Sequence, residues 1–261
     1  MAGTAEREIL FFKLLAEHAP MTQVVQCLGT KLLEDEDVGL LLLERVGGAT
    51  IEYEGPVEAH LPRYKKAIRG LANLHSRWWN HPQIGTGDLA THWTTELVTS
   101  SVLLAEDGLR GLIQTESGRS LPASRIEKIV SATEHVLLLH AQGDRPKCLT
   151  HGDAALWNFV MDADTESLVK MVDFQMWCIN PPAWDVAYMI VLLWPPEFRD
   201  QFGNEMISAY LDELRVLGVS YSTEELSEDI RVCIVGLITL VLAYYHLGIW
   251  DRDIACDRLG W

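Results

Sequence analysis

The stretch that decides the fold is Leu149-Thr-His-Gly-Asp-Ala-Ala-Leu-Trp-Asn-Phe-Val-Met161, which is followed by Val169-Lys-Met-Val-Asp-Phe-Gln175. Residues 159–161 and 168–172 are short apolar runs that predict two strands. Asp162, Asp164 and Thr165 lie between these runs and favour a turn. The sequence therefore predicts a hairpin, and this hairpin brings the loop before its first strand close to the end of its second strand.

Three polar side chains lie at the mouth of the predicted hairpin. Asp153 and Asn158 are five residues apart on the loop that enters the first strand, and Asp173 ends the second strand. Phosphoryl transfer uses such a set: one Asp accepts the proton of the attacking hydroxyl, while an Asn and a second Asp hold the Mg²⁺ that bridges the nucleotide phosphates. Each residue alone could be an ordinary turn residue. His151 and Asp153 could also form a His-x-Asp metal pair, but no second cluster with suitable spacing accompanies them.

The segment that precedes this region combines one helix with two strands. Residues 6–18 predict an amphipathic helix, and residues 24–30 and 38–46 predict the strands. The acidic run Glu34-Asp35-Glu36-Asp37 is typical of a solvated turn between them. Gly47-Gly48 ends the second strand and begins a linker, because paired glycines permit a sharp change of direction.

The remainder of the chain is mainly helical in pattern, with helices predicted at residues 63–79, 95–104, 123–140, 184–193, 196–217 and 223–247. Residues 232–250 are apolar over about the length that spans a bilayer, which leaves an integral-membrane protein as an alternative. Gly236, Thr239 and the absence of a flanking basic cluster favour a buried helix instead. We expect His246 to find a polar partner there.

Composition restricts the classes of partner. Hydrophobic residues make up 48% and charged residues 22%, which is typical of a packed globular chain. The net charge of −16 disfavours binding to nucleic acid or to anionic membrane surfaces. The five cysteines are widely spaced and include no CxxC pair, which predicts reduced thiols and a cytoplasmic location. The oligomeric state stays open.

The motifs together resemble the signature of the aminoglycoside phosphotransferase and choline kinase-like superfamily: His151-Gly152-Asp153 with Asn158, then Asp173-Phe174-Gln175, then Pro181-Pro182-Ala183-Trp184-Asp185-Val186-Ala187. Asp-Phe-Gln and the Trp beside Asn158 are most similar to its ecdysteroid-kinase-like branch. Residues 40–44 resemble the strand that leads into the hinge between the lobes, and Leu71-Ala72-Asn73-Leu74-His75 resembles a helical element of the same families. The resemblance covers residues 6 to about 247.

The resemblance implies an α+β, protein-kinase-like fold. Residues 1–47 would form a small, truncated N-lobe of one helix and antiparallel strands. Residues 48–261 would form a large, mainly helical C-lobe that carries the motifs. The implied activity is an ATP- and Mg²⁺-dependent transfer of phosphate to a hydroxyl of a small molecule, and the branch resemblance together with the many aromatic residues suggests a partly apolar alcohol.

The resemblance also assigns roles to individual residues. Asp153 would be the catalytic base, and Asn158 and Asp173 the metal ligands, also in contact with the nucleotide. Glu44 and Val46 would contact the nucleotide at the hinge. Three further residues would support the site: His151 by packing, Asp185 by binding backbone N–H groups of the loop, and Glu8 as the counterpart of the glutamate that pairs with a phosphate-binding Lys.

That Lys has no counterpart at the family position. Neither Lys13, within the predicted helix, nor Lys31, on the following hairpin, matches it, and no Gly-rich loop precedes the helix. We therefore expect Glu8 to face solvent or a substitute cation, and we expect weak nucleotide binding and slow turnover. The alternative function is a catalytically impaired kinase-like binding protein.

Single aromatic and imidazole side chains carry less information. An apolar substrate pocket could be lined by tryptophans, although core packing is the simpler interpretation of any one of them; the candidates are Trp78, Trp79, Trp157, Trp177, Trp184 and Trp194. His75 is more typical of a helix surface or of a hydrogen-bonded core residue than of a metal ligand.

Overall fold

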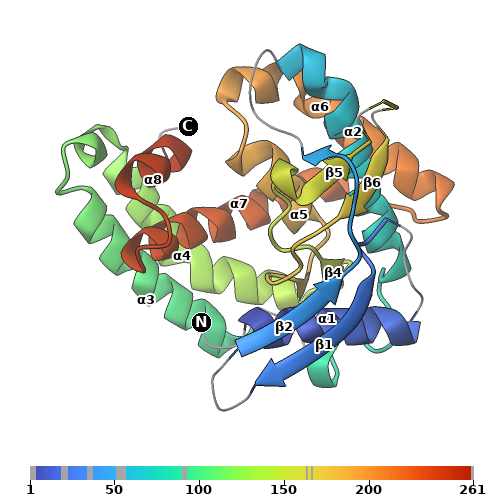
Figure 1. Ribbon diagram of the computed structural model, residues 1–261. Helices are drawn as coiled ribbons and strands as arrows, with labels where there is room; N and C mark the ends of the chain where they lie inside the picture. Colours follow the sequence, from blue (N-terminus) through green and yellow to red (C-terminus); the bar gives the residue numbers. More distant parts are fainter. Residues whose placement is uncertain are drawn as a thin grey trace.

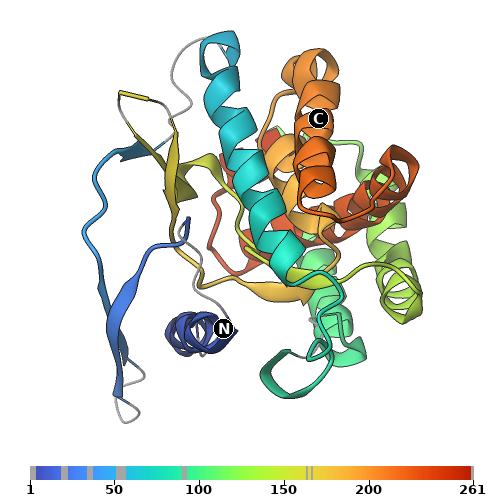
Figure 2. The same ribbon diagram turned by 90° about the vertical axis from the view of Figure 1, so that its right-hand side faces the viewer.

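The computed structural model describes residues 4–18, 23–33, 38–50, 57–89, 93–162, 164–165 and 167–259. The acidic turn at residues 34–37 lies outside the described residues. The helix and the β hairpin near the N-terminus lie at one end of the molecule, and the helices that follow make up the rest (Figures 1 and 2). The prediction of a small β-containing part and a large helical part is confirmed.

The N-terminal part consists of α1 (Thr4–His18), β1 (Cys27–Leu33) and β2 (Val38–Leu43). The two strands are antiparallel, with Cys27 opposite Leu43 and Leu33 opposite Val38. The first strand begins later than expected, because Val24 forms a parallel bridge with Met171 instead of pairing with β2. Helix α1 contacts both strands.

Two further sheets carry the central loop region. The first has the order β3-β5-β6, from β3 (Ala49–Thr50), β5 (Phe159–Met161) and β6 (Leu168–Met171). The predicted hairpin is therefore confirmed. The second sheet pairs β4 (Cys148–Thr150) with β7 (Cys178–Asn180), two buried strands of three residues each that the sequence pattern did not indicate. Backbone hydrogen bonds from Val25 N to Met171 O (3.1 Å) and from Met171 N to Gln23 O (2.6 Å) join the N-terminal segment to the hairpin.

The helical part contains α2 (Val57–Arg77), α3 (Thr95–Leu112), α4 (Ala123–Gln142), α5 (Ala183–Ala187), α6 (Pro196–Val216), α7 (Thr223–His246) and α8 (Arg252–Leu259). Helix α3 extends past its predicted end, and α8 was not predicted. Helix α5 continues as a π-helical turn, Tyr188–Leu192. Short 3-10 turns occupy Gly87–Leu89, Ser117–Ser120 and Leu156–Asn158.

The apolar run at residues 232–250 belongs mostly to α7, which packs against α3 and α4. Close backbone approach is part of this packing: a Cβ on Gly108 of α3 would lie 2.1 Å from the carbonyl oxygen of Leu242. None of the helices within the described residues is long and apolar enough to cross a bilayer. The expectation for His246 is wrong, because this residue is exposed at the end of α7 and water can hydrate its imidazole.

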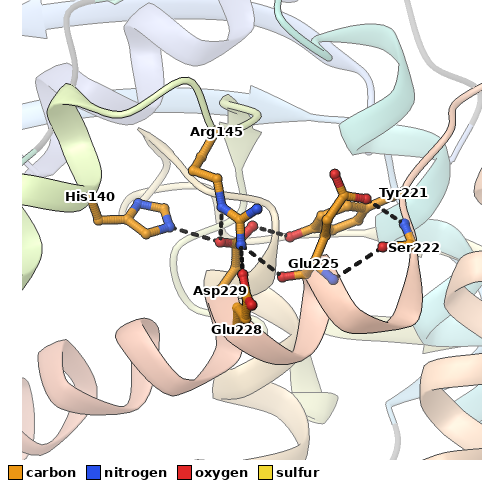
Figure 3. A network of polar contacts seen from close by, with 7 residues as sticks. All are labelled: His140, Arg145, Tyr221, Ser222, Glu225, Glu228 and Asp229. Atoms are coloured by element: carbon orange, nitrogen blue, oxygen red, sulfur yellow. Dashed lines mark hydrogen bonds and ion pairs between the residues drawn. The ribbon is translucent and has the colours of Figure 1, made fainter.

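A buried carboxylate fixes the start of α7 (Figure 3). Asp229 accepts hydrogen bonds from His140 Nε2 and Arg145 Nε, both at 2.8 Å, and from the Tyr221 hydroxyl. Burial alone would raise the pKa of Asp229, but the hydrogen bonds from His140 and Tyr221 and the charge of Arg145 hold that pKa below its ordinary value. Ser222 and Glu225 form a capping box at the same end of the helix. Because Arg145 lies three residues before β4, the network also fixes the entry to the central loop.

Candidate active site

The loop that follows β4 depends on a glycine. Gly152 has a φ of +82°, and a Cβ at this position would lie 1.8 Å from the carbonyl oxygen of Met176. Any other residue would therefore be strained and would also clash with the backbone. The close approach places Asp153, the next residue, beside the segment that begins at Asp173.

Asp185, in the first turn of α5, holds this loop through hydrogen bonds to its backbone. Its Oδ2 accepts from His151 N (2.7 Å) and its Oδ1 accepts from Gly152 N (2.9 Å). These are the backbone contacts that the family resemblance implied for Asp185. The carboxylate is completely buried. Because this carboxylate satisfies two buried backbone N–H groups at once, it fixes the backbone before Asp153 and so the direction of the Asp153 side chain.

His75 of α2 completes the surroundings of this carboxylate. Its Nε2 lies 2.9 Å from Asp185 Oδ2, and its Nδ1 lies 2.7 Å from the Tyr210 hydroxyl. A proton on Nε2 satisfies both contacts, since Nε2–H then donates to the carboxylate and Nδ1 accepts from the tyrosine. His75 is thus a hydrogen-bonded core residue that orients Asp185. Its place in the Leu-Ala-Asn-Leu-His element was the only sequence signal for this role, and Tyr210 had none.

His151 also supports the loop rather than facing the cavity beside Asp153. Its Nε2 lies 3.0 Å from the carbonyl oxygen of Val172, to which Nε2–H donates, and its ring lies 4.4 Å from the ring of Phe174. The imidazole is buried, and its Nδ1 has no hydrogen-bond partner among the described residues. The contact with Val172 ties the loop to the residue just before Asp173.

The three predicted chemical residues come together. Asn158 Nδ2 donates to the Asp153 carbonyl oxygen (2.9 Å) and lies 3.3 Å from Asp153 Oδ2. The backbone carbonyl oxygen of Asn158 in turn accepts from Val172 N (3.0 Å), which brings the end of β6 close to the loop. Asp173 has a φ of +63°, an uncommon conformation for an aspartate. Burial raises the pKa of Asp173, and the negative charge of Asp153 adds to the rise.

These residues suit a hard divalent cation. The amide nitrogen of Asn158 is engaged by Asp153, so the side-chain oxygen Oδ1 is the atom left to serve as a ligand. Asp173 supplies carboxylate oxygens in a half-buried position that a cation would stabilise. The described residues contain no cluster of three or more His, Cys, Asp or Glu arranged as a metal site. Two oxygen ligands supplemented by water and phosphate are typical of Mg²⁺.

Helix α1 contacts the segment that begins at Asp173. Glu8 Oε1 accepts from Phe174 N (3.1 Å), and Phe11 stacks on Phe174 with ring centroids 3.9 Å apart. The expectation that Glu8 faces solvent or a cation stays a prediction for Oε2, because Oε1 binds a backbone N–H and the side chain is only partly buried. Burial raises the pKa of Glu8, although the Phe174 hydrogen bond opposes the rise, and the charge of Asp173 adds to it.

A second contact of α1 could not be predicted from the sequence. The Arg7 guanidinium lies 5.2 Å from the centre of the Trp177 ring and donates to the Trp177 carbonyl oxygen. Trp177 Nε1 donates back to the Arg7 carbonyl oxygen at 2.6 Å. The two residues are separated by 170 positions in the chain, so no local pattern relates them.

Glu44 and Val46, the residues that the resemblance assigns to a hinge, have their own contacts. Glu44 Oε1 accepts from Gln26 N (2.8 Å) and pairs with Lys170 Nζ (2.7 Å). The hydrogen bonds from Lys170 and Gln26 lower the pKa of Glu44. Val46 is partly buried against the core. The backbone of Glu44 is engaged as well, because its N–H donates to the Gln26 carbonyl oxygen (2.9 Å).

A cavity of about 510 Å³ opens beside Asp153. Its walls come from the loop that carries Asp153, the π-helical turn after α5, and the segment from α7 to α8. They include Trp157, Tyr188, Leu193, Tyr244, Ile249 and Trp250. Burial raises the pKa of Tyr244 to about 12, and the charge of Asp153 adds to this rise. Of the tryptophans considered from the sequence, Trp157 lines this cavity, whereas Trp78, Trp177, Trp184 and Trp194 are core residues and Trp79 packs against the core.

Most of the chain matches a known protein family. The phosphotransferase enzyme family, APH, matches residues 2–219. The chain belongs to this family. The predicted superfamily resemblance is thereby confirmed, while the ecdysteroid-kinase-like branch stays a prediction. None of the curated protein sequences matches the chain significantly.

Solved structures of other phosphotransferases share the fold. An aminoglycoside-3′-phosphotransferase of type VIII is 20% identical with a TM-score of 0.55, and the match covers 90% of this chain and 81% of that one. Choline kinase LicA from Streptococcus pneumoniae is 16% identical with a TM-score of 0.59, covering 98% and 78%. The GDP complex of aminoglycoside 2′-phosphotransferase-IIIa is 15% identical with a TM-score of 0.59, covering 99% and 80%. The predicted kinase-like fold is therefore confirmed.

Proposed function

We propose that this protein transfers the terminal phosphoryl group of ATP to a hydroxyl of a small molecule in a Mg²⁺-dependent reaction. The observation that carries the proposal is the convergence of Asp153, Asn158 and Asp173, with Asp153 in the wall of a cavity large enough for a small molecule. Membership in the phosphotransferase family supports the same reaction class.

Asp153 is the proposed base. It lies in the cavity wall, where it can orient an acceptor hydroxyl and accept its proton as the new P–O bond forms. Asn158 holds the backbone carbonyl and the carboxylate of Asp153 through one amide group, which limits the motion of that carboxylate. Asn158 and Asp173 are the proposed ligands of Mg²⁺, which when bound neutralises charge on the nucleotide phosphates.

The remaining predicted residues act through these three. Asp185 and His151 hold the loop, and Glu8 holds the backbone of Phe174 next to the metal ligand. We propose that the nucleotide contacts the hinge at Glu44 and Val46, between an N-lobe of residues 1–47 and a C-lobe of residues 48–261. The five free cysteines fit a reducing, cytoplasmic compartment.

A second candidate is a kinase-like protein that binds its ligands without turnover. One observation favours it: among the described residues no ion pair with Lys or Arg involves Glu8, so the site holds no cation partner for that carboxylate there. In phosphoryl transfer, a Lys at the phosphates stabilises charge in the transition state. The two candidates agree on ligand binding and differ in turnover.

The test measures binding and turnover separately. Calorimetry with ATP and Mg²⁺ gives nucleotide affinity, and ADP release in the presence of streptomycin, choline or decahydro-2-naphthol gives transfer. Asp173→Asn should abolish the Mg²⁺-dependent part of nucleotide binding, and Asp153→Asn should lower acceptor-stimulated ADP release on the order of 10²–10⁴-fold while nucleotide still binds.

The matched control is Asp212→Asn, because Asp212 is exposed on α6 and pairs only locally with Arg215 (2.7 Å). It should behave as wild type in both assays. Binding without ADP release from any acceptor would favour the second candidate, and an Asp153→Asn variant as active as wild type would refute the proposed role of Asp153.

A further inference from the structure

A second cavity lies among the helices of the large part of the molecule. Helices α3, α4 and α7 contact one another (Figure 1) and enclose a cavity of about 90 Å³, which we call the inter-helix cavity. None of the described residues lines both this cavity and the one beside Asp153. Ala243 lines the inter-helix cavity, and Tyr244, the next residue of α7, lines the other. Helix α7 is therefore a wall of both cavities and separates them.

The lining of the inter-helix cavity is mainly apolar. Two buried tryptophans, Trp93 and Trp184, meet edge to face in its wall with ring centroids 6.0 Å apart. The described part of the lining contains no Asp, Glu, Lys, Arg or His. A charged ligand would lose its hydration there without gaining a counter-charge, which is costly. The lining therefore selects an uncharged ligand.

The hydroxyl groups of the lining are already engaged within the protein. Ser101 Oγ donates to the Leu97 carbonyl oxygen at 2.8 Å. Thr133 Oγ1 lies 2.9 Å from Thr239 Oγ1, which in turn lies 3.1 Å from the Val235 carbonyl oxygen. If Thr133 donates to Thr239 and Thr239 donates to Val235, both protons are used. A buried water needs about two to four polar partners, so a cavity whose hydroxyls are engaged suits an apolar ligand better than water.

The size and the opening of the inter-helix cavity limit the ligand further. Leu97 is 45% exposed and Ser101 is only partly buried, so the cavity opens to solvent beside α3. An apolar protein cavity of about 150 Å³ stays dry and binds benzene. The inter-helix cavity is smaller, and an outward rotation of the exposed Leu97 side chain would widen it for a single ring. A ligand of roughly four to six heavy atoms therefore fits.

Trp184 connects the inter-helix cavity with the candidate active site. A Cβ on Gly236 would lie 2.9 Å from Cζ3 of Trp184, so the Trp184 ring lies directly against the backbone of α7. The next residue, Asp185, accepts hydrogen bonds from the backbone of the loop that carries Asp153. A ligand that packs on Trp184 therefore restrains the same short helix, α5, that holds this loop.

We propose that the inter-helix cavity is a second ligand site, which binds a compact, uncharged apolar molecule, and that the ligand stabilises the loop that carries Asp153 through Trp184 and Asp185. The ligand would gain dispersion contacts with the two tryptophan rings and would remove their apolar surface from water. Because the cavity exists only in the folded chain, binding raises the temperature of unfolding. The inference concerns binding alone and does not depend on phosphoryl transfer.

The direct test uses benzene and pyridazine as probes of the full 261-residue chain. The two molecules have nearly the same shape, but pyridazine has two ring nitrogens that must lose their hydrogen bonds with water. Calorimetry should show that benzene binds at least about tenfold more tightly than pyridazine. Saturating benzene should also raise the midpoint of thermal unfolding by at least about 2 °C. Tighter binding of pyridazine, or no binding of benzene, would overturn the inference.

Variants that fill the cavity assign the binding to this site. Ser101→Leu places a larger side chain in the lining at a partly exposed position, so the chain should fold while its affinity for benzene falls at least about tenfold. Ala243→Leu fills the cavity from α7 and should have the same effect. The matched control is Ser100→Leu, because Ser100 is exposed, precedes Ser101 on α3 and is not part of the lining. Wild-type affinity in the folded filling variants would place benzene elsewhere and refute the assignment.

Amide hydrogen exchange tests the connection with the loop. The N–H groups of His151 and Gly152 donate to the carboxylate in α5, and bound benzene should slow their exchange at least about threefold more than that of Glu44 N, in the distant hairpin. The difference should disappear in Ser101→Leu. Equal slowing at all three amides would indicate global stabilisation only and would contradict the route through Trp184. Neither binding nor exchange requires turnover, so an absence of ADP release would count against the proposed function and not against this site.

Discussion

Replacing Asp185 tests whether the buried carboxylate positions the catalytic loop. It accepts hydrogen bonds from His151 N, Gly152 N and His75 Nε2 at 2.7, 2.9 and 2.9 Å, all in the interior. In Asp185→Asn the side chain keeps its shape, but one oxygen becomes an NH₂ group that faces a donor. A buried donor left without an acceptor costs about 1–3 kcal/mol, and bonds to a charged acceptor contribute about 1.5–3 kcal/mol. We therefore expect Asp185→Asn to lower the free energy of unfolding by about 2–3 kcal/mol.

Asp185→Ala removes all three acceptor contacts and should cost at least about 3 kcal/mol, because each buried donor left without an acceptor costs about 1–3 kcal/mol. The assay is equilibrium urea unfolding followed by tryptophan fluorescence, with ADP release measured in conditions where the variant is folded. Because the loop carries Asp153, turnover should fall further than the folded fraction does. The control Asp212→Asn removes an exposed ion pair and should change stability by less than about 1 kcal/mol. Wild-type stability and activity in Asp185→Asn would refute the reasoning.

Three other substitutions probe separate contacts. Gly152→Ala should destabilise the fold and reduce turnover, because its Cβ would lie 1.8 Å from the Met176 carbonyl oxygen. Gly29→Ala is the control, because a Cβ there would have nothing within 4 Å and should change neither stability, measured by thermal unfolding, nor turnover, measured by ADP release. The pKa of Asp229 is held below its ordinary value, so the stability that its carboxylate contributes is present above about pH 4 and is lost as the pH falls through the folded pKa. Thermal unfolding between pH 3 and 7 should therefore show a smaller loss of stability toward acid in Asp229→Asn than in wild type, and an equal dependence of stability on pH in the two proteins would contradict this. The pKa of Glu8 is raised in the folded protein, so ionisation of this carboxylate destabilises the fold as the pH rises through the unfolded and then the folded pKa. Glu8→Gln keeps an acceptor for Phe174 N and should be at least as stable as wild type at pH 8, and a clear loss of stability at that pH would argue against this.

The sequence predicted the long helices well, because apolar periodicity over many residues reflects the face that each helix buries. It predicted the β5–β6 hairpin for a similar reason, since turn-forming residues separate two apolar runs. It did not indicate β4 and β7, because strands of three residues are too short to show an alternation. The first strand was placed too early, because the partner of Val24 is Met171, a residue that is distant in the chain.

What the sequence alone determined about the candidate site was the set of chemical groups and their order: Asp153, Asn158 and Asp173, with Asp185 behind them. Their spacing along one hairpin is a local property, and local spacing can be read from residue types. Only the tertiary structure decided how these groups are supported and what they face. Glu8 contacts Phe174 across 166 positions of the chain and Arg7 contacts Trp177 across 170, and the cavity wall combines the loop that carries Asp153 with α8. Such contacts depend on the packing of whole helices, in which each partner is selected by burial and shape and leaves no signal at a fixed separation in the sequence.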